Sequence, residues 1–243
     1  MTNKYDNLLT NTKNIMKKLL LAALCMAATM QTYAQTVAED WAGLKHYQTA
    51  NQTIKQPVKV VFMGNSITAG WPKFRPDFFT ENHYVGRGIP CQVSAQMVMR
   101  FRQDVLLLKP QAVVILAGTN DIALNDYAVT LEHTLGNIQT MVDLAHAHGI
   151  KAVVCATPPA HRLGTKELHP AEKIKELNAM VKKYTHEAGI PYVDFHTALT
   201  DEEGGMQKQY TYDGVHPTKE GYLVMENLVQ QALHQVLQLT EKE

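Results

Sequence analysis

Four short polar segments of the sequence carry residue types that can act together on a substrate. They are Gly64–Thr68, Gly86–Gln92, Gly118–Asp121 and Tyr212–Pro217. The first offers a serine hydroxyl, the second a glycine-rich turn whose backbone N–H groups can receive an anion, and the third an asparagine amide. The fourth places an aspartate three residues before a histidine, so that the carboxylate can reach the imidazole across one turn and fix its tautomer.

Each segment also has an ordinary structural interpretation when it is taken alone. Ser66 can cap a following helix, and Asn120 with Asp121 makes a common turn pair. The glycine-rich segment can be a simple turn, and a single histidine is more often structural than catalytic. The chain holds 11 histidines, and the ten others lack the Asp-Gly-Val-His-Pro context of the fourth segment.

The elements that must position these segments follow from the hydrophobic pattern, in which short apolar runs alternate with amphipathic stretches of helical period. The predicted strands are residues 58–63, 83–85, 112–117, 151–156 and 191–195. The predicted helices are residues 94–108, 129–148, 171–188 and 220–239. This alternation implies right-handed crossovers and a parallel sheet, and apolar strands imply cover on both faces. We therefore predict an α/β fold, a three-layer α/β/α sandwich around a central, mostly parallel five-stranded sheet.

The polar segments fall where such a sheet binds its ligands. Gly64–Thr68 follows the first predicted strand directly, and Gly118–Asp121 follows the strand that ends at Ala117. Open α/β sheets bind ligands at the carboxyl ends of their strands. The predicted fold thus places these segments in one crevice.

Taken together and in order, the four segments resemble the sequence blocks of the SGNH/GDSL hydrolases. The resemblance extends from about Lys59 to Tyr222, and its most specific parts are Asp-Gly-Val-His-Pro and Gly-Thr-Asn-Asp. The first block reads Gly-Asn-Ser instead of Gly-Asp-Ser, a variation that the family tolerates. Arg87-Gly-Ile followed by Gln92-x-Ser-Ala-Gln-Met is similar to the branch with platelet-activating-factor acetylhydrolase-type esterases and bacterial GDSL acylhydrolases. The resemblance implies a flavodoxin-like fold and a serine esterase.

The resemblance also implies roles for matched positions. Ser66 would be the nucleophile, His216 the general base and Asp213 the residue that orients His216. The Asn120 amide and the Ser66 N–H would be oxyanion donors. The remaining donor would be a backbone N–H at Cys91, because the run Gly-Ile-Pro-Cys stands where relatives typically read Gly-Ile-x-Gly.

Cys91 is a departure from the family's pattern. A backbone N–H survives the change from glycine, but a Cβ restricts the backbone and narrows the pocket. Gly88 is the nearby alternative for this donor.

Three further residues are candidates for substrate contact. Asn65 adjoins the serine, and Trp71 and Tyr212 can each form an aromatic wall for a sugar or acyl group or lie in the core. His161 and Arg162 leave a strand end and can reach the crevice or lie in a surface loop.

The substrate is predicted to be a small-molecule or glycan ester. We expect short acyl groups, first an acetyl ester on a carbohydrate and second a small lipid ester such as a lysophospholipid. A catalytically impaired glycan-binding protein of the same fold is the alternative from another class.

Composition narrows the partners. Lys plus Arg and Asp plus Glu both number 23 in 243 residues, which gives no basic excess for a nucleic-acid partner. No Cys or His pair has zinc spacing, so we expect no metal and no cofactor. Cys91 and Cys155 can pair only if the fold brings them together.

The N-terminus predicts export. Lys17 and Lys18 precede an apolar run over residues 19–30, and Ala34 offers a cleavage site. This run is shorter than the about 20 residues that span a bilayer, so we expect no stable membrane insertion. Residues 1–34 are therefore predicted as a signal peptide with its natural start at Met16, and 35–243 as one SGNH hydrolase domain. The mature protein would be periplasmic or extracellular.

Overall fold

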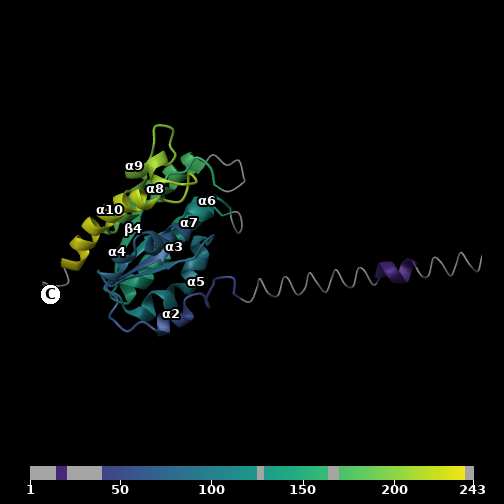
Figure 1. Cartoon of the computed structure of the whole chain (residues 1–243), viewed down its shortest axis with the longest axis horizontal. Coiled ribbons are helices and arrows are strands. Elements are labelled where there is room, and N and C mark those ends of the chain that lie inside the picture. The colour runs from purple at the N-terminus through teal and green to yellow at the C-terminus, as the bar shows by residue number, and fades with distance from the viewer. Residues whose placement is uncertain (1–14, 21–39, 125–128, 164–169, 239–243) are drawn as a thin grey trace, which may run out of the picture. The chain divides into compact units, whose positions relative to one another are not determined.

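The computed structural model describes residues 15–20, 40–124, 129–163 and 170–238 of the chain. It consists of two compact units, Met1–Trp41 and Ala42–Glu243 (Figure 1). Within the first unit, residues 15–20 are helical. Most of the predicted signal peptide, including Ala34, lies outside the described residues. No helix in the described ranges combines the length and apolar character needed to cross a bilayer.

A five-stranded sheet forms the centre of the second unit. Its strands are β1 (Val60–Gly64), β2 (Tyr84–Gly88), β3 (Ala112–Leu116), β4 (Lys151–Cys155) and β5 (Tyr192–Val193). The strand order is β2-β1-β3-β4-β5, and all four pairings are parallel. This order is that of flavodoxin-like sheets. The predicted α/β fold is confirmed, and the sheet is parallel throughout.

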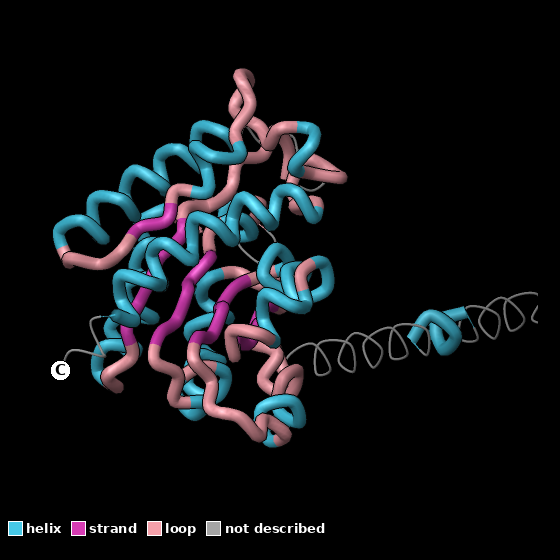
Figure 2. The backbone as a smooth tube through the Cα atoms, turned by 60° about the vertical axis from the view of Figure 1, so that its left-hand side comes forward, coloured by secondary structure: helices cyan, strands magenta, loops and turns pink. Residues whose placement is uncertain are grey.

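Helices cover both faces of the sheet. The side chains of each strand alternate between the two faces of the sheet, so each strand contributes to two hydrophobic cores. One face packs on α5 (Ser94–Asp104), α7 (Leu131–Ala147) and α8 (Pro170–Glu187). The other packs on α3 (Ser66–Phe74), α4 (Pro76–Thr80), α9 (Phe195–Leu199) and α10 (Lys219–Gln238). In β1, Val61 and Met63 belong to the first core, whereas Val60 and Phe62 belong to the second. Figure 2 shows the strands between these helices.

Several short elements complete the described part of the chain. They are α2 (Gln48–Gln52), α6 (Thr119–Ile122) and the 3-10 helices η1 (Leu106–Leu108) and η2 (Lys208–Tyr210).

Three predicted elements differ from those observed. The strand predicted over residues 83–85 is observed over Tyr84–Gly88, so Gly86–Gly88 belong to β2 and not to the predicted turn. The predicted helix over residues 94–108 ends as an α-helix at Asp104 and continues as η1. The last predicted strand shortens to two residues because Asp194 caps α9, its Oδ1 accepting a hydrogen bond of 3.0 Å from the Thr197 N–H.

Candidate active site

Ser66 lies at the carboxyl end of β1, where it is the first residue of α3. Asn65 makes the turn between the two elements and caps the helix, because its Oδ1 accepts a hydrogen bond of 3.0 Å from the Ile67 N–H. The side chain of Asn65 is completely buried. The prediction that Asn65 contacts substrate is therefore wrong, since this side chain serves the turn that presents Ser66.

His216 connects Ser66 to Asp213. The imidazole Nε2 lies 2.9 Å from the Ser66 Oγ, and its Nδ1 lies 2.6 Å from the Asp213 Oδ2. The other carboxylate oxygen, Oδ1, accepts hydrogen bonds from the backbone N–H groups of His216 and Val215. Residues 150 positions apart in the chain thus form one hydrogen-bonded row.

The surroundings of Asp213 keep its carboxyl group ionised. Partial burial acts to raise its pKa, but the hydrogen bonds from the backbone and imidazole of His216 and from Val215 outweigh burial. The net pKa lies below the ordinary value for aspartate. The site therefore holds a carboxylate against the imidazole, the form that stabilises an imidazolium.

Thr211 closes the turn that carries Asp213 and His216. Its hydroxyl donates to the His216 carbonyl oxygen at 2.8 Å and accepts from the Gly214 N–H at 2.9 Å. Thr211 also forms an isolated antiparallel bridge with Pro217. Sequence reasoning did not single out Thr211, although its place two residues before the aspartate at the start of a turn is a usable signal.

Asn120 approaches the same site from the end of β3. It lies in α6, which Gly118 begins with a φ of 111° that disfavours other residues. A Cβ at Gly118 would also lie 2.5 Å from Leu177. The Asn120 amide donates a hydrogen bond of 2.9 Å to the Gln92 carbonyl oxygen, which orients the amide and joins the second predicted segment to the third.

Cys91, which the family resemblance places at a glycine position, has a glycine-like backbone conformation. Its φ is 64°, in the left-handed region. Cys91 lines the same cavity as Ser66, whereas Gly88 is buried in β2, where an added Cβ would lie 2.2 Å from the Ala69 nitrogen. Of the two alternatives for the third oxyanion donor, Cys91 is the one placed at the cavity.

A cavity of about 680 Å³ unites these residues. Its lining includes Ser66, Cys91, Asn120, Arg162, Asp213 and His216. Leu163 and Val215 add apolar surface. The fold therefore brings all four polar segments of the sequence to one opening at the carboxyl ends of the strands, together with Arg162.

Trp71 does not line this cavity. It is 1% exposed, stacks on Phe78 and Tyr222, and donates a hydrogen bond of 3.0 Å from Nε1 to Glu226. The prediction of Trp71 as a substrate contact is wrong, because α3 turns this side chain into the core. Tyr212 is 62% exposed and its ring stacks on His216, with centroids 5.8 Å apart.

A buried ion pair in α5 holds two segments of the site together. The Arg100 guanidinium contacts the Asp104 carboxylate at 2.9 Å, and both side chains are fully buried. Arg100 also donates to the Gly64 carbonyl oxygen at 2.9 Å and to the Gln92 Oε1 at 2.6 Å. Arg100 therefore ties the serine turn to the loop that bears Cys91. An arginine between Met97 and Phe101 on a predicted apolar helix face is the signal that sequence reasoning passed over.

Asp121 makes a second buried connection. Its carboxylate accepts hydrogen bonds from the backbone N–H and the hydroxyl of Ser94, at the start of α5. Burial raises the pKa of Asp121, and the hydrogen bonds from Ser94 only partly oppose it. The third segment is thereby fixed to the helix that follows the second.

Within the described ranges, no group of three or more His, Cys, Asp or Glu side chains has a geometry that could hold a metal ion. Cys91 and Cys155 are both free thiols and do not pair with one another.

The profile of the GDSL-like lipase/acylhydrolase family matches residues 62–224, which include all four polar segments. The chain belongs to this family, and it is an ester hydrolase. A search of curated proteins gave no match.

Solved structures agree with this assignment. A GDSL-like lipase from Bacteroides thetaiotaomicron is 45% identical over 80% of this chain and 98% of its own, with a TM-score of 0.77. A candidate acylhydrolase from Bacteroides fragilis is 46% identical over 82% of this chain and 99% of its own, with a TM-score of 0.78. A mutant acetylxylan esterase from Geobacillus stearothermophilus shares the fold at 17% identity, over 74% of this chain and 95% of its own, with a TM-score of 0.59.

Proposed function

We propose that this protein is an exported serine esterase that removes short acyl groups, above all acetyl groups, from carbohydrate esters. Ser66 is the nucleophile, His216 the general base and Asp213 its partner. The observation that carries the proposal is the hydrogen-bonded row from the Asp213 carboxylate through the imidazole to the Ser66 hydroxyl, which opens on a cavity.

The reaction proceeds by two acyl transfers. His216 Nε2 accepts the proton of the Ser66 hydroxyl while the Oγ forms a bond to the ester carbonyl carbon. The tetrahedral intermediate collapses when the protonated imidazole gives this proton to the leaving alcohol oxygen. Water then attacks the acyl-enzyme with the same assistance, which releases the acid and restores Ser66.

The negative charge that develops on the carbonyl oxygen requires fixed donors. The Asn120 amide and the backbone N–H groups of Ser66 and Cys91 fill this role in the proposal. Their support is that all three residues line the same cavity and that a hydrogen bond orients Asn120. Donors fixed before the reaction stabilise the transition state without reorganising during it.

Two observations favour an exported carbohydrate esterase. The basic and apolar N-terminal segment has the pattern of a signal peptide, which directs the protein to substrates outside the cytoplasm. An acetylxylan esterase has the same fold, so acetylated glycans are the first natural substrates to test.

Ser66→Ala tests the proposal. We expect the wild-type protein to hydrolyse p-nitrophenyl acetate and Ser66→Ala to fall to the background rate, with an unchanged circular dichroism spectrum. A fluorophosphonate should add one adduct to the wild type at Ser66, as located by peptide mass spectrometry. Undiminished hydrolysis by Ser66→Ala would remove this serine from the mechanism, and no hydrolysis by the wild type would favour a glycan-binding protein without activity.

A substrate panel tests the acyl group. We expect kcat/KM to be highest for acetylated oligosaccharides and to fall as the acyl chain of a p-nitrophenyl ester lengthens. Faster hydrolysis of a lysophospholipid than of any acetylated oligosaccharide would contradict the carbohydrate assignment while leaving the serine mechanism in place.

A further inference from the structure

An exposed aromatic pair lies directly beside the reacting imidazole. Tyr212 is 62% exposed and stacks on His216 with an interplanar angle of 14°. Tyr212 also makes an offset contact with Phe74, which is 41% exposed, with ring centroids 6.3 Å apart. Phe74 in turn packs on the buried Tyr222, so the pair is anchored to the core. We call Phe74 and Tyr212 the aromatic strip.

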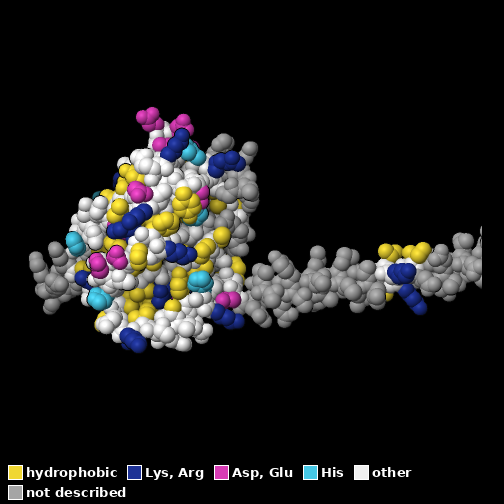
Figure 3. Space-filling view, in the orientation of Figure 1, with side chains coloured by type: hydrophobic (Ala, Val, Ile, Leu, Met, Phe, Trp, Pro, Cys, Tyr) yellow, Lys and Arg dark blue, Asp and Glu magenta, His cyan; other side chains and the backbone are white. Residues whose placement is uncertain are grey.

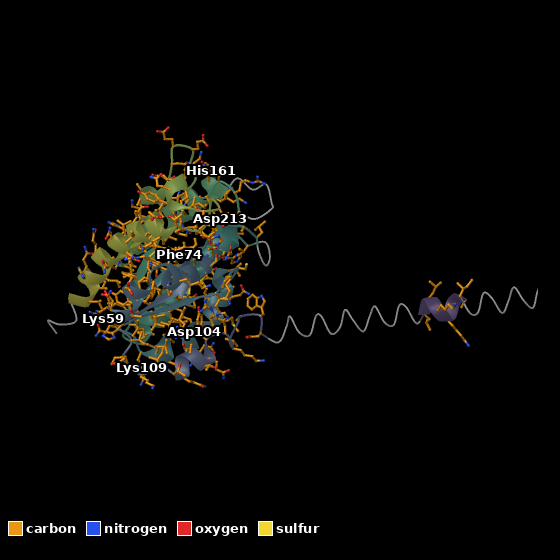
Figure 4. All side chains as sticks on the ribbon, viewed as in Figure 1. Lys59, Phe74, Asp104, Lys109, His161 and Asp213 are labelled. Atoms are coloured by element: carbon orange, nitrogen blue, oxygen red, sulfur yellow. The ribbon has the colours of Figure 1, made fainter. Side chains whose placement is uncertain are left out.

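A second cavity, of about 700 Å³, is lined in part by the turn that holds Tyr212. Asp213 lines both this cavity and the one that contains Ser66. The neighbours His161 and Arg162 are divided in the same way, with His161 in the second cavity and Arg162 in the first. The two cavities therefore adjoin across the Asp213 turn. Figure 4 shows His161, Asp213 and Phe74 following one another on one side of the molecule.

Several of the polar groups that line the second cavity are already held in place. The Gln207 amide donates to the Thr200 carbonyl oxygen at 3.0 Å, and the Gln209 amide donates to the Gln207 Oε1 at 2.9 Å. Asp201 is occupied by His161 at 3.1 Å and by two backbone N–H groups. Oriented amides and hydroxyls suit the hydroxyl groups of a neutral ligand, because their own rotamers need little ordering on binding.

Acidic side chains outnumber basic ones around this cavity. Glu202 and Glu203 line it beside Asp201, with Lys208 as a basic neighbour, and the Glu203 side chain is 87% exposed. Figure 3 shows acidic side chains at the top of the view, above the place where Figure 4 labels His161, with a Lys or Arg side chain beside them. Like charges at a binding site oppose an anionic ligand, so this excess of acidic side chains disfavours a phosphate or carboxylate on the substrate.

The mechanism itself fixes which part of the ester faces the aromatic strip. His216 must give its proton to the leaving oxygen, so the alcohol part of the substrate passes close to the imidazole. Tyr212 covers one side of that imidazole and borders the second cavity. We propose that the second cavity and the aromatic strip bind the alcohol part of the substrate, as a neutral sugar ring seated on Tyr212. This inference rests on the proposed esterase function and adds the subsite that selects the leaving group.

The test compares two acetyl esters that share the acyl group and differ in the alcohol. Acetylated xylo-oligosaccharides supply a sugar ring, and ethyl acetate supplies none. Tyr212→Ala should lower the ratio of kcat/KM for the sugar ester to that for ethyl acetate by about 3- to 10-fold, the range for losing one aromatic stacking contact. Tyr212→Phe should keep the wild-type ratio, because the ring is retained. Met99→Ala removes an exposed apolar side chain outside both cavities and should also keep the ratio.

The outcomes separate this inference from the proposed function. Equal losses for both esters in Tyr212→Ala would overturn the subsite, because Tyr212 would then act only on His216. Preference for an acetylated uronic acid or for acetylcholine over a neutral sugar ester would also overturn it. Calorimetric titration of Ser66→Ala with xylo-oligosaccharides measures the subsite without turnover. If these oligosaccharides bind and Tyr212→Ala weakens the binding, the subsite is supported even without esterase activity. If they do not bind but esterase activity is normal, the subsite alone is contradicted.

Discussion

Asn120 joins two parts of the site through one hydrogen bond, from its side-chain amide to the Gln92 carbonyl oxygen. Asn120→Ala removes a donor that the proposed mechanism uses only while charge develops on the substrate. We expect kcat to fall by about 10²- to 10³-fold with little change in KM. Steady-state kinetics with p-nitrophenyl acetate measure this loss.

Asn137→Ala is a matched control for that substitution. Asn137 also donates a side-chain hydrogen bond, of 2.9 Å to the Ser94 Oγ, but it does not line the cavity. Its kcat should stay near the wild-type value. A fully active Asn120→Ala enzyme would remove Asn120 from the oxyanion hole.

The ionisation of Asp213 bears on how kcat/KM depends on pH in acidic solution. Its pKa is lowered, because hydrogen bonds from His216 and Val215 outweigh its partial burial. Its ionised form therefore favours the folded site fully above the ordinary aspartate pKa of about 3.9, and this contribution is lost only as the pH falls through the lower folded value. We therefore expect Asp213 to stay ionised, and not to limit kcat/KM, in weakly acidic solution.

A pH–rate profile of ester hydrolysis checks this assignment. Asp213→Asn should reduce kcat by orders of magnitude at every pH, since an amide neither stabilises an imidazolium nor fixes the required tautomer. A wild-type acid limb centred near pH 4 would instead point to Asp213 as the titrating group.

At the scale of elements, α5 contributes a buried charge to the site. Arg100 and Asp104 are fully buried and bonded to each other, and Asp104 also accepts a hydrogen bond of 2.8 Å from Asn51. Arg100→Met leaves a buried carboxylate without its cation, so we expect the free energy of unfolding to fall by about 3–5 kcal/mol. Urea denaturation measures this change.

A double substitution separates charge from packing. Arg100→Met with Asp104→Leu removes both charges and should recover part of the stability lost in Arg100→Met. An Arg100→Met protein as stable as the wild type would show that the ion pair does not hold α5 against the serine turn.

Strands and helices were predicted most accurately from the sequence where a single element contains a long pattern of buried apolar residues. Residues 112–117 and 129–148 were predicted within two residues of β3 and α7. β5 was predicted too long because Val193 and Phe195 continue an apolar run, while the capping of α9 by Asp194 depends on one local hydrogen bond. Short helices such as α6 have too few residues for a periodic pattern.

The site residues that could be predicted are those that directly follow a strand of the sheet. Ser66 and Asn120 follow parallel neighbouring strands, so their proximity follows from the topology. Trp71 was predicted wrongly because five residues of α-helix rotate a side chain by about 500°, or about 140° away from Ser66. Arg100 was missed because its contacts with Gly64 and Gln92 are tertiary, and the sequence shows no local pattern for them.

For the molecule as a whole, the proposed export can be tested by locating the expressed protein. Expression of the full chain in a bacterial host should give a periplasmic or secreted product that begins near Gln35, as measured by intact mass. Replacing Leu20 and Leu21 by arginine interrupts the apolar run and should retain the uncleaved protein in the cytoplasm. Cytoplasmic, full-length product from the unaltered chain would contradict the signal peptide.

The exposed thiol of Cys91 has a practical consequence for anyone who studies this enzyme with inhibitors. Cys91 shares its cavity with Ser66, whereas Cys155 is buried. An alkylating reagent would attach at Cys91 and obstruct the opening, so inactivation by iodoacetamide would be no sign of a cysteine nucleophile. The same thiol is an attachment point for a fluorophore or a tethered fragment that reports on whatever enters beside the serine.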